Sequence, residues 1–242
     1  MPGLDWLTAR PVAHRGLHDA AAGIVENTAS AFSAAVAGGY AIECDLQLSA
    51  DGEAMVFHDD RLGRLTGRDD AVKSLSATEL KAIVFRATPD RMLTLGELCD
   101  LVAGRVTLVL ELKSHFDRET ALAARVAAVL ESYAGPVAAM SFDPVMVRGL
   151  RSAASGLPRG LVAQSRIDPE VRTVSRWDYA AAALSARPHF LAWSVADLPG
   201  VWPLLGRWGF GLPLLTWTVR SEADRHRAAR WADQMIFEGF RP

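Results

Sequence analysis

The sequence is poor in cysteine and carries no excess of charge of either sign. Its 242 residues include two cysteines, Cys44 and Cys99, too few for the disulfide framework of a small secreted protein. The 26 lysines and arginines nearly balance the 28 acidic residues, so the net charge of −2 gives no electrostatic reason to expect a nucleic-acid partner. Half of the residues are hydrophobic, which is too many for a disordered chain. The composition therefore indicates a folded globular protein.

The sequence also lacks long hydrophobic runs. No segment approaches the ~18 consecutive apolar residues that a membrane-spanning helix needs. The first ten residues contain the acidic Asp5 and no apolar run of signal-peptide length. We therefore expect a cytoplasmic protein without stable insertion into a membrane, whereas the oligomeric state stays open.

Short segments rich in Val, Ile and Leu alternate with segments of helical periodicity, which is typical of repeated βα units. Eight strands are predicted, mostly without polar alternation, as in buried parallel sheets. They span residues 11–14, 41–45, 107–112, 137–140, 160–163, 190–193, 213–218 and 235–237. Predicted helices span residues 28–37, 95–103, 118–133, 144–154, 170–177, 199–208 and 221–231. This pattern predicts one α/β domain over residues 1–242, a (β/α)₈ barrel.

Two intervals depart from the βα alternation. Too few residues separate the second strand from the apolar run 54–57 for a helical crossover, and Asp51-Gly52 is a strong hairpin signal. A two-residue turn would pair residue 50 with 53, 48 with 55 and 45 with 58, which brings His58 beside Asp45. Residues 60–93 are predicted to form a small insertion at the barrel rim, with a capped helix at 80–84.

The chain ends shortly after the eighth predicted strand, so no eighth helix is expected. We expect the N-terminal residues Leu4, Trp6 and Leu7 to cover the gap.

Polar residues follow the first strands of the predicted barrel, at the end where barrel enzymes carry their active sites. The first strand ends in His14-Arg15, and the hairpin ends in His58. Alternation places Glu43 and Asp45 on one face of the second strand, with Cys44 on the other, and gives Glu111 and Lys113 a common face. These side chains are therefore expected to meet at the mouth of the barrel.

Three close carboxylates repel one another unless protons or a cation lie between them. Oxygen ligands favour Mg²⁺ or Ca²⁺, with Mn²⁺ a further option, over Zn²⁺. We therefore predict that Glu43, Asp45 and Glu111 bind one divalent cation. Arg15 and Lys113 add positive charge suited to a phosphate group.

Two histidines beside a metal-bound phosphodiester suggest paired proton transfer. One of His14 and His58 would take a proton from the attacking oxygen, and the other would give one to the leaving alcohol. Glu26 and Asn27 are expected to cap the first helix and to brace Arg15.

Six short motifs, which occur in a fixed order and extend over nearly the whole chain, resemble those of a known enzyme family. They are His14-Arg15-Gly16, Glu26-Asn27-Thr28, Glu43-x-Asp45, His58-Asp59, Glu111-x-Lys113 and Trp217-Thr218-Val219. Together they resemble the glycerophosphodiester phosphodiesterase family of phospholipase-C-like barrels. The resemblance implies metal-dependent hydrolysis of glycerophosphodiesters to sn-glycerol 3-phosphate and an alcohol. It also implies that Trp217 lines the glycerol or leaving-group side of the site.

The sequence departs from the family pattern at two strand ends. Arg220 stands where the family usually has Asn, and the usual Gly-Ile-Ile-Thr-Asp near the end is here Gln234-Met235-Ile236-Phe237-Glu238. Arg220 could pair with an anionic or sugar-bearing head group, so the released alcohol stays open. A lysophospholipase D or another lipid or sugar phosphodiesterase, and a phosphodiester-binding protein without activity, are the alternatives. Direct hydrolysis and a cyclic-phosphate intermediate also remain open.

Overall fold

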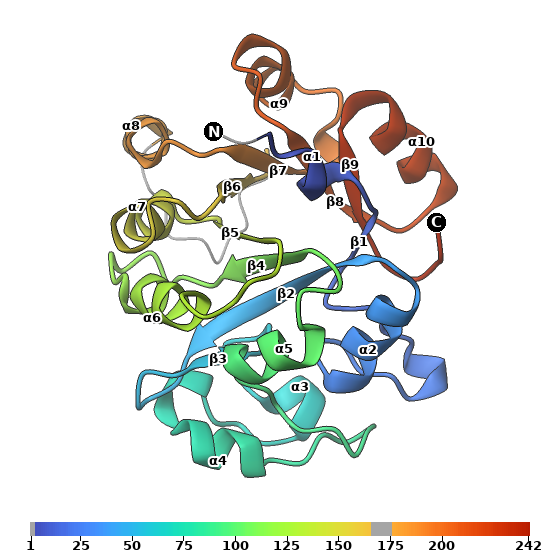
Figure 1. Cartoon of the computed structure of the whole chain (residues 1–242), viewed down its shortest axis with the longest axis vertical. Helices are drawn as coiled ribbons and strands as arrows, with labels where there is room; N and C mark the ends of the chain where they lie inside the picture. The colour runs from blue at the N-terminus through green and yellow to red at the C-terminus, as the bar shows by residue number, and fades with distance from the viewer. Residues whose placement is uncertain (1–2, 166–175) are drawn as a thin grey trace.

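The computed structural model describes residues 3–165 and 176–242. Eight parallel strands form a closed barrel, because β1 pairs with both β2 and β9. The strands are β1 (Val12–Ala13), β2 (Ala41–Leu48), β4 (Leu108–Leu112), β5 (Val137–Ser141), β6 (Arg159–Ala163), β7 (Phe190–Ser194), β8 (Leu214–Val219) and β9 (Gln234–Phe237). The predicted (β/α)₈ barrel is confirmed (Figure 1).

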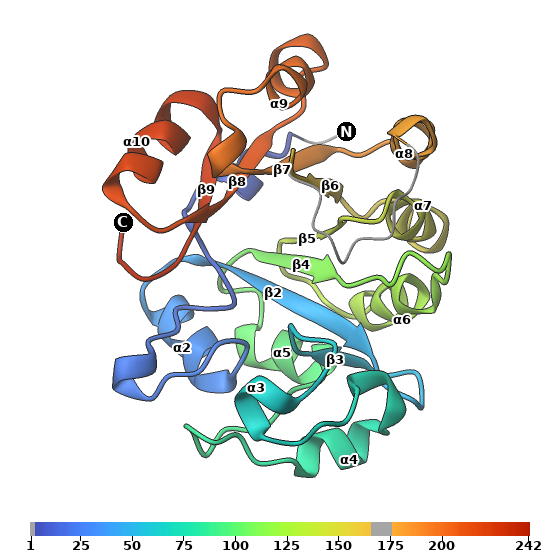
Figure 2. The same ribbon diagram turned by 180° about the vertical axis from the view of Figure 1, so that it is seen from behind.

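Helices surround the barrel on its outer side (Figures 1 and 2). The α-helices are α1 (Asp5–Thr8), α2 (Ala29–Ala37), α3 (Gly63–Thr66), α4 (Ala77–Ala82), α5 (Leu95–Val102), α6 (Ala121–Leu130), α7 (Pro144–Ala153), α8 (Arg176–Ala186), α9 (Val201–Leu204) and α10 (Glu222–Trp231). The 3₁₀ turns are η1 (Ala20–Ala22), η2 (Val72–Ser74) and η3 (Val195–Asp197), and η4 (Leu205–Gly209) is a π-helical turn that continues α9.

Local sequence signals explain several helix ends. A capping box of Thr94 with Glu97 starts α5, and Asp143 caps α7 before a proline in its first turn. The helix predicted at 118–133 is shorter at both ends. The helix predicted at 170–177 lies mostly outside the described residues, and the described helix α8 runs on to Ala186.

The interior of the barrel is apolar at one end and polar at the other. Inward side chains such as Val109 and Leu215 form the apolar end, and Leu7 of α1 packs among them. Helix α1 therefore closes the N-terminal ends of the strands, and Figure 1 looks onto this end. The expectation that Leu4, Trp6 and Leu7 cover the outer gap of the missing eighth helix is wrong, because they pack against the barrel interior. The polar end lies opposite.

The outward side chains of the strands pack against the helices. Cys44 belongs to this outer core, and both Cys44 and Cys99 are buried free thiols. Burial raises the pKa of Cys44 well above its ordinary value. The outward orientation of Cys44 leaves its neighbours Glu43 and Asp45 facing the barrel interior.

The hairpin after β2 exists, but its predicted register is wrong by one residue. Strand β3 (Ala54–Val56) is antiparallel to β2, with Leu48 opposite Ala54 and Leu46 opposite Val56. The turn contains three residues, because the Ser49 N–H donates to the Glu53 carbonyl, and Gly52 takes a left-handed φ of 84°. The extra turn residue shifts every pair by one.

Residues 60–93 form the expected insertion and contain α3, η2 and α4 (Figure 2). A small apolar cluster holds it together, including Phe57, Leu62, Leu80 and Phe85. The capped helix predicted at 80–84 is present, but it spans Ala77–Ala82 and its capping box consists of Ser76 and Glu79.

Candidate active site

Three carboxylates converge where β2 and β4 reach the polar end of the barrel. Asp45 lies beside Glu111 in the parallel register of the two strands, and Glu43 precedes Asp45 on the same face. One oxygen of each lies within 4.8 Å of the others. Glu43 and Asp45 are 1% exposed and Glu111 is 8% exposed. The structure thus brings together the three residues that the sequence predicts as metal ligands.

Two cations offset part of this negative charge. Lys113 Nζ lies 2.7 Å from Asp45 Oδ1 and 2.5 Å from Glu111 Oε1, and Arg15 Nε lies 3.3 Å from Asp45 Oδ2. Burial would raise the pKa of Asp45, but Lys113 and His58 outweigh it and hold this pKa well below its usual range. Burial alone would lower the pKa of Lys113, but the charges of Asp45 and Glu111 outweigh burial, so the pKa is raised above its ordinary value.

Glu43 has an oxygen that the described residues leave unsatisfied. Its Oε2 accepts the backbone N–H of Arg15 at 3.0 Å, whereas its buried Oε1 has no hydrogen-bond partner in the described part of the chain. Burial raises the pKa of Glu43, and the charges of Asp45 and Glu111 raise it further. A buried carboxylate oxygen without a partner is costly. A hard divalent cation among the three carboxylates would remove that cost, so these residues fit such an ion.

The loop after β1 holds Arg15 against the cluster. Arg15 has a left-handed φ of 55°, which costs a non-glycine residue about 1–2 kcal/mol. Its contact with Glu43 and an ion pair from Nη1 to Glu26 Oε1 at 2.7 Å offset this cost. Gly16 follows with φ 80°, and a Cβ there would lie 2.9 Å from the backbone of Ala31.

Asn27 has a different contact from the predicted one. Thr28 takes the N-cap position of α2, and Asn27 instead donates from Nδ2 to Asp45 Oδ2 at 2.9 Å. Its left-handed φ of 56°, which asparagine tolerates, lets the chain turn there before α2 begins. The expectation that Asn27 caps this helix is therefore wrong. Glu26 does brace Arg15, as expected.

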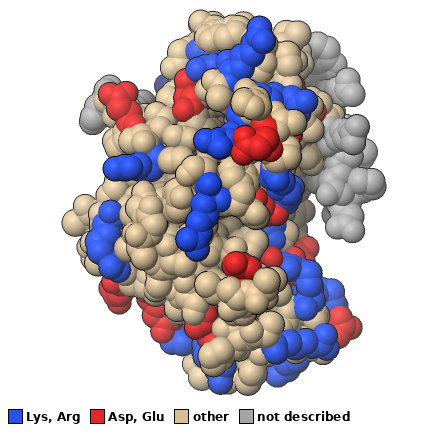
Figure 3. All heavy atoms as spheres, turned by 90° about the vertical axis from the view of Figure 1, so that its right-hand side faces the viewer, with Lys and Arg blue, Asp and Glu red and all other residues tan. Residues whose placement is uncertain are grey.

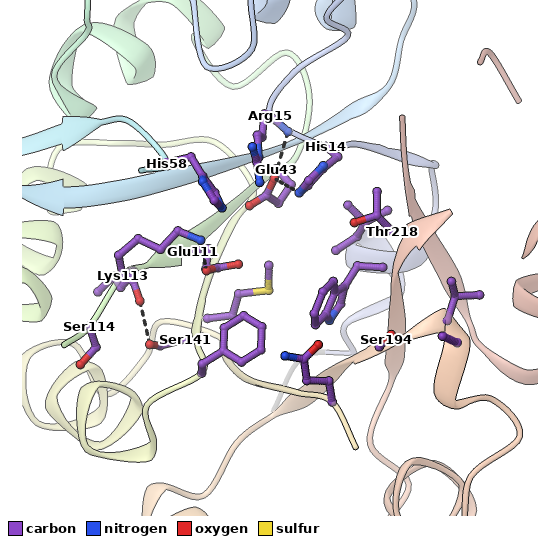
Figure 4. A pocket seen from close by; sticks show the side chains of 18 of the residues that line it. His14, Arg15, Glu43, His58, Glu111, Lys113, Ser114, Ser141, Ser194 and Thr218 are labelled. Carbon is purple, nitrogen blue, oxygen red and sulfur yellow. Dashed lines mark hydrogen bonds and ion pairs between the residues drawn. The ribbon is translucent and has the colours of Figure 1, made fainter. Parts of the chain in front are cut away.

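His14 and His58 lie on either side of Glu43 (Figure 4). Each histidine is bound to a carboxylate through Nδ1, since His14 lies 2.5 Å from Glu238 Oε2 and His58 lies 2.7 Å from Asp59 Oδ1. A carboxylate partner makes Nδ1 the donor atom, which leaves Nε2 for other contacts. His14 Nε2 lies 3.9 Å from Glu43 Oε2. Both imidazoles are therefore held in a fixed orientation beside the cluster.

Burial lowers the pKa of His58 below its ordinary 6.5. The charge of Lys113 lowers this pKa further, and the charge of Asp45 offsets only part of the decrease. The imidazole of His58 is therefore predominantly neutral at pH 7. Burial would raise the pKa of its partner Asp59, but hydrogen bonds from Arg64 and His58 lower it. Arg64 Nε donates to Asp59 Oδ2 at 2.7 Å, so the insertion braces the hairpin histidine.

The sequence alone gives Glu238 no role, yet it is the partner of His14. Arg220 Nε donates to Glu238 Oε1 at 2.5 Å, and His18 Nε2 lies 3.7 Å from its Oε2. Burial would raise the pKa of Glu238, but hydrogen bonds from His14 and Arg220, together with the nearby His18 imidazole, hold it well below its usual range. The two departures from the family pattern, at residues 220 and 238, are therefore in contact with each other.

A cavity of about 620 Å³ lies at the polar end of the barrel. His14, Arg15, Glu43, His58, Glu111 and Lys113 line one side (Figure 4). Phe142 and Trp217 line the cavity as well, with ring centroids 5.4 Å apart. Trp217 Nε1 is buried and has no hydrogen-bond partner among the described residues. The cavity thus joins a charged side to an aromatic one, and Arg220 also lines it.

The family model described as the glycerophosphoryl diester phosphodiesterase family matches residues 14–240. A glycerophosphodiester phosphodiesterase of Caldanaerobacter subterraneus is 28% identical over 230 residues, covering 89% of this chain and 88% of the relative. A glycerophosphodiester phosphodiesterase of Bacillus subtilis is 24% identical over 221 residues, covering 82% of this chain and 73% of the relative.

Solved structures share the fold. A putative glycerophosphoryl diester phosphodiesterase of Silicibacter pomeroyi has a TM-score of 0.76 at 26% identity, covering 94% of this chain and 89% of that chain. A phosphodiesterase of Oleispira antarctica, solved in complex with its product sn-glycerol-3-phosphate, has a TM-score of 0.79 at 21% identity. That alignment covers 96% of this chain and 94% of the Oleispira chain.

Proposed function

The chain belongs to the glycerophosphoryl diester phosphodiesterase family, and from this premise we propose that residues 1–242 act as one metal-dependent domain that hydrolyses glycerophosphodiesters. The expected products are sn-glycerol 3-phosphate and an alcohol, and the Oleispira phosphodiesterase binds the first of these. The observation that carries the proposal is the buried cluster of Glu43, Asp45 and Glu111 between two carboxylate-bound histidines.

The polar side of the cavity suits a phosphodiester. Glu43, Asp45 and Glu111 would hold one divalent cation, Mg²⁺, Ca²⁺ or Mn²⁺. When bound, such an ion neutralises charge that develops on the phosphoryl oxygens. Lys113 and Arg15 would bind the same anionic group from the protein side, because both ammonium and guanidinium groups form charge-assisted hydrogen bonds with phosphate.

The two histidines would move the protons. A bond forms between phosphorus and the attacking oxygen, and the bond from phosphorus to the alcohol oxygen breaks. The neutral Nε2 of His58 would take the proton of the attacking hydroxyl or water, because burial lowers the pKa of this histidine. His14, held by Glu238 through Nδ1, would donate a proton from Nε2 to the leaving alcohol oxygen. Glu238 and Asp59 thus act as positioning residues.

The aromatic side of the cavity would bind the uncharged parts of the substrate. Trp217 presents a buried indole N–H that can donate to a substrate hydroxyl. Arg220 lies at this side but pairs with Glu238, so its guanidinium is shared between the protein and any head group. We propose that this pair contributes to the choice of the released alcohol.

A panel of glycerophosphodiesters tests the proposal. Choline, ethanolamine, inositol and sugar diesters are assayed with each of the three ions, and the phosphorus products are followed by NMR. Release of sn-glycerol 3-phosphate that stops on chelation and returns with one of the ions is expected. Binding without turnover of any diester would instead support a phosphodiester-binding protein.

Two further measurements address the open alternatives. Turnover in heavy-oxygen water distinguishes direct hydrolysis, which labels the phosphate at once, from a route through a cyclic phosphate, which is seen as a transient species. A lysophospholipid in the panel tests lysophospholipase D activity. No helix in residues 3–165 and 176–242 is long and apolar enough to span a membrane. The cytoplasmic location expected from the sequence stays a prediction, which cell fractionation tests.

A further inference from the structure

The segment from Val201 to Phe210 exposes large apolar side chains to solvent. The exposed fractions are 78% for Val201, 70% for Trp202, 44% for Leu205, 62% for Trp208 and 70% for Phe210. We call these five residues the apolar ridge. Soluble proteins rarely expose a contiguous apolar patch of this kind without a binding role. We therefore expect the apolar ridge to bind a partner.

The packing of α9 and η4 explains why the ridge points outward. Pro203 and Gly206 are buried, and a Cβ on Gly206 would lie 2.3 Å from Leu191 Cδ1. The small residues of this segment thus pack against the barrel, and the large ones remain outside. A surface helix ordinarily has the opposite arrangement, with its large apolar residues buried. Packing among residues 3–165 and 176–242 consequently does not explain the ridge.

Arginine side chains accompany the ridge. The guanidinium of Arg207 lies 5.9 Å from the ring centroid of Trp208, and that of Arg230 lies 5.0 Å from the centroid of Trp231. Trp231 in turn lies 6.0 Å from Trp208. Tryptophan beside arginine is typical of segments that lie at the surface of an anionic bilayer.

The charge around the ridge differs from that of the whole chain. Residues 198–233 contain five arginines against three acidic residues, although the chain as a whole has a net charge of −2. Residues 198–221 contain no acidic residue at all. In the space-filling view of Figure 3, the upper part of the molecule, where Figure 1 places α9 and α10, is largely tan, with blue basic and red acidic atoms beside one another. Four of these arginines pair with carboxylates, namely Arg207 with Asp233, Arg220 with Glu238, Arg225 with Glu222 and Arg227 with Asp224, whereas Arg230 has no ion pair among the described residues. The Arg230 guanidinium beside Trp231 complements anionic lipid head groups.

We propose that the apolar ridge, with Arg230 beside it, docks the protein onto an anionic lipid surface. In a twofold contact between copies of this chain the ridge would meet itself, and Arg230 beside it would face a like charge. An anionic lipid surface satisfies both the apolar and the cationic features. The ridge follows the cavity wall closely in sequence, because η3, whose residues Val195 and Ala196 line the cavity, is followed in the chain by α9.

Vesicle sedimentation tests the proposal without substrate, so its outcome is independent of the enzymatic proposal. The probes are large unilamellar vesicles of phosphatidylcholine alone or mixed with an equal amount of phosphatidylglycerol. The wild type is expected to bind the anionic vesicles. A triple variant with Val201→Ser, Trp202→Ser and Phe210→Ser should bind roughly tenfold more weakly. Arg230→Gln should weaken binding to the anionic vesicles roughly fivefold, and high salt should also weaken binding of the wild type.

Leu184→Ser is the matched control, because Leu184 is 77% exposed on α8 and outside the ridge, and this variant should bind like the wild type. Circular dichroism and the unfolding midpoint verify that each variant folds. The proposal is overturned if the wild type does not sediment with anionic vesicles or if the triple variant binds equally well. A wild-type dimer in light scattering that the triple variant dissociates, without vesicle binding, would assign the ridge to a second copy and also overturn it.

Discussion

Replacing Glu43 by glutamine should change stability and activity in opposite directions. The side chain keeps its size, and its carbonyl oxygen can still accept the Arg15 N–H. The unsatisfied carboxylate oxygen is replaced by an amide that can donate to Asp45 or Glu111 in the same cluster. A buried polar atom without a partner costs about 1–3 kcal/mol. The metal-free variant should therefore be more stable than the metal-free wild type by about that amount.

Thermal unfolding after chelation measures this difference. In a chain of this size each kcal/mol raises Tm by about 2–4 °C. Adding Mg²⁺ or Ca²⁺ at roughly a hundred times its Kd should stabilise the wild type by about 2.7 kcal/mol, through binding to the folded state alone. The same addition should leave Glu43→Gln nearly unchanged, and turnover by this variant should be lost.

The pH dependence of this difference has a defined sign. The folded pKa of Glu43 is raised above its ordinary 4.5, so the folded chain takes up a proton there more readily than the unfolded chain. The advantage of Glu43→Gln should therefore shrink as the pH falls towards 4.5 and grow as the pH rises through the raised pKa. Glu53→Gln is the matched control on the same hairpin. Glu53 pairs with Arg125 at 2.7 Å, so this variant should be slightly less stable. A less stable Glu43→Gln that still responds to the metal would refute the reasoning.

His14→Ala and His58→Ala should each lower kcat by about 10²- to 10⁴-fold with Tm little changed, and an unchanged kcat would remove that residue from the mechanism. Glu238→Gln should lower kcat about 10- to 100-fold, with Glu238→Asp restoring part of the rate, because His14 loses the carboxylate that orients it. The same change releases Arg220, so the KM should change with the head group of the diester. The acidic limb of kcat/KM should lie below pH 6.5, since burial lowers the pKa of His58, and a limb above that value would contradict the assignment of His58 as the base.

The barrel was predictable because buried parallel strands have a distinct apolar character, and the strand ends then point to the site. Alternation alone placed Glu43 and Asp45 on one face. The register of the hairpin was not predictable from Asp51-Gly52, because a glycine in a left-handed conformation serves both a two-residue and a three-residue turn. His58 nevertheless lies close enough to Asp45 for the two side chains to interact electrostatically.

The partners of the site residues were harder to predict than the site residues themselves. Asn27 precedes Thr28, the N-cap residue of α2, and its contact with Asp45 depends on a left-handed backbone that the sequence does not specify. Glu238 and Arg220 lie at the ends of β9 and β8, and their contact depends on the adjacency of these two strands. That adjacency, together with the two departures from the family pattern, was the available signal.

The central claim is that Glu43, Asp45 and Glu111 hold one divalent cation. A crystal structure grown with Mn²⁺ and recorded for its anomalous signal tests it most directly. The account predicts one peak that all three carboxylates contact, with an oxygen of Glu43 among its ligands. A fully loaded and active protein whose peak lies elsewhere, or whose three carboxylates contact no ion, would contradict it.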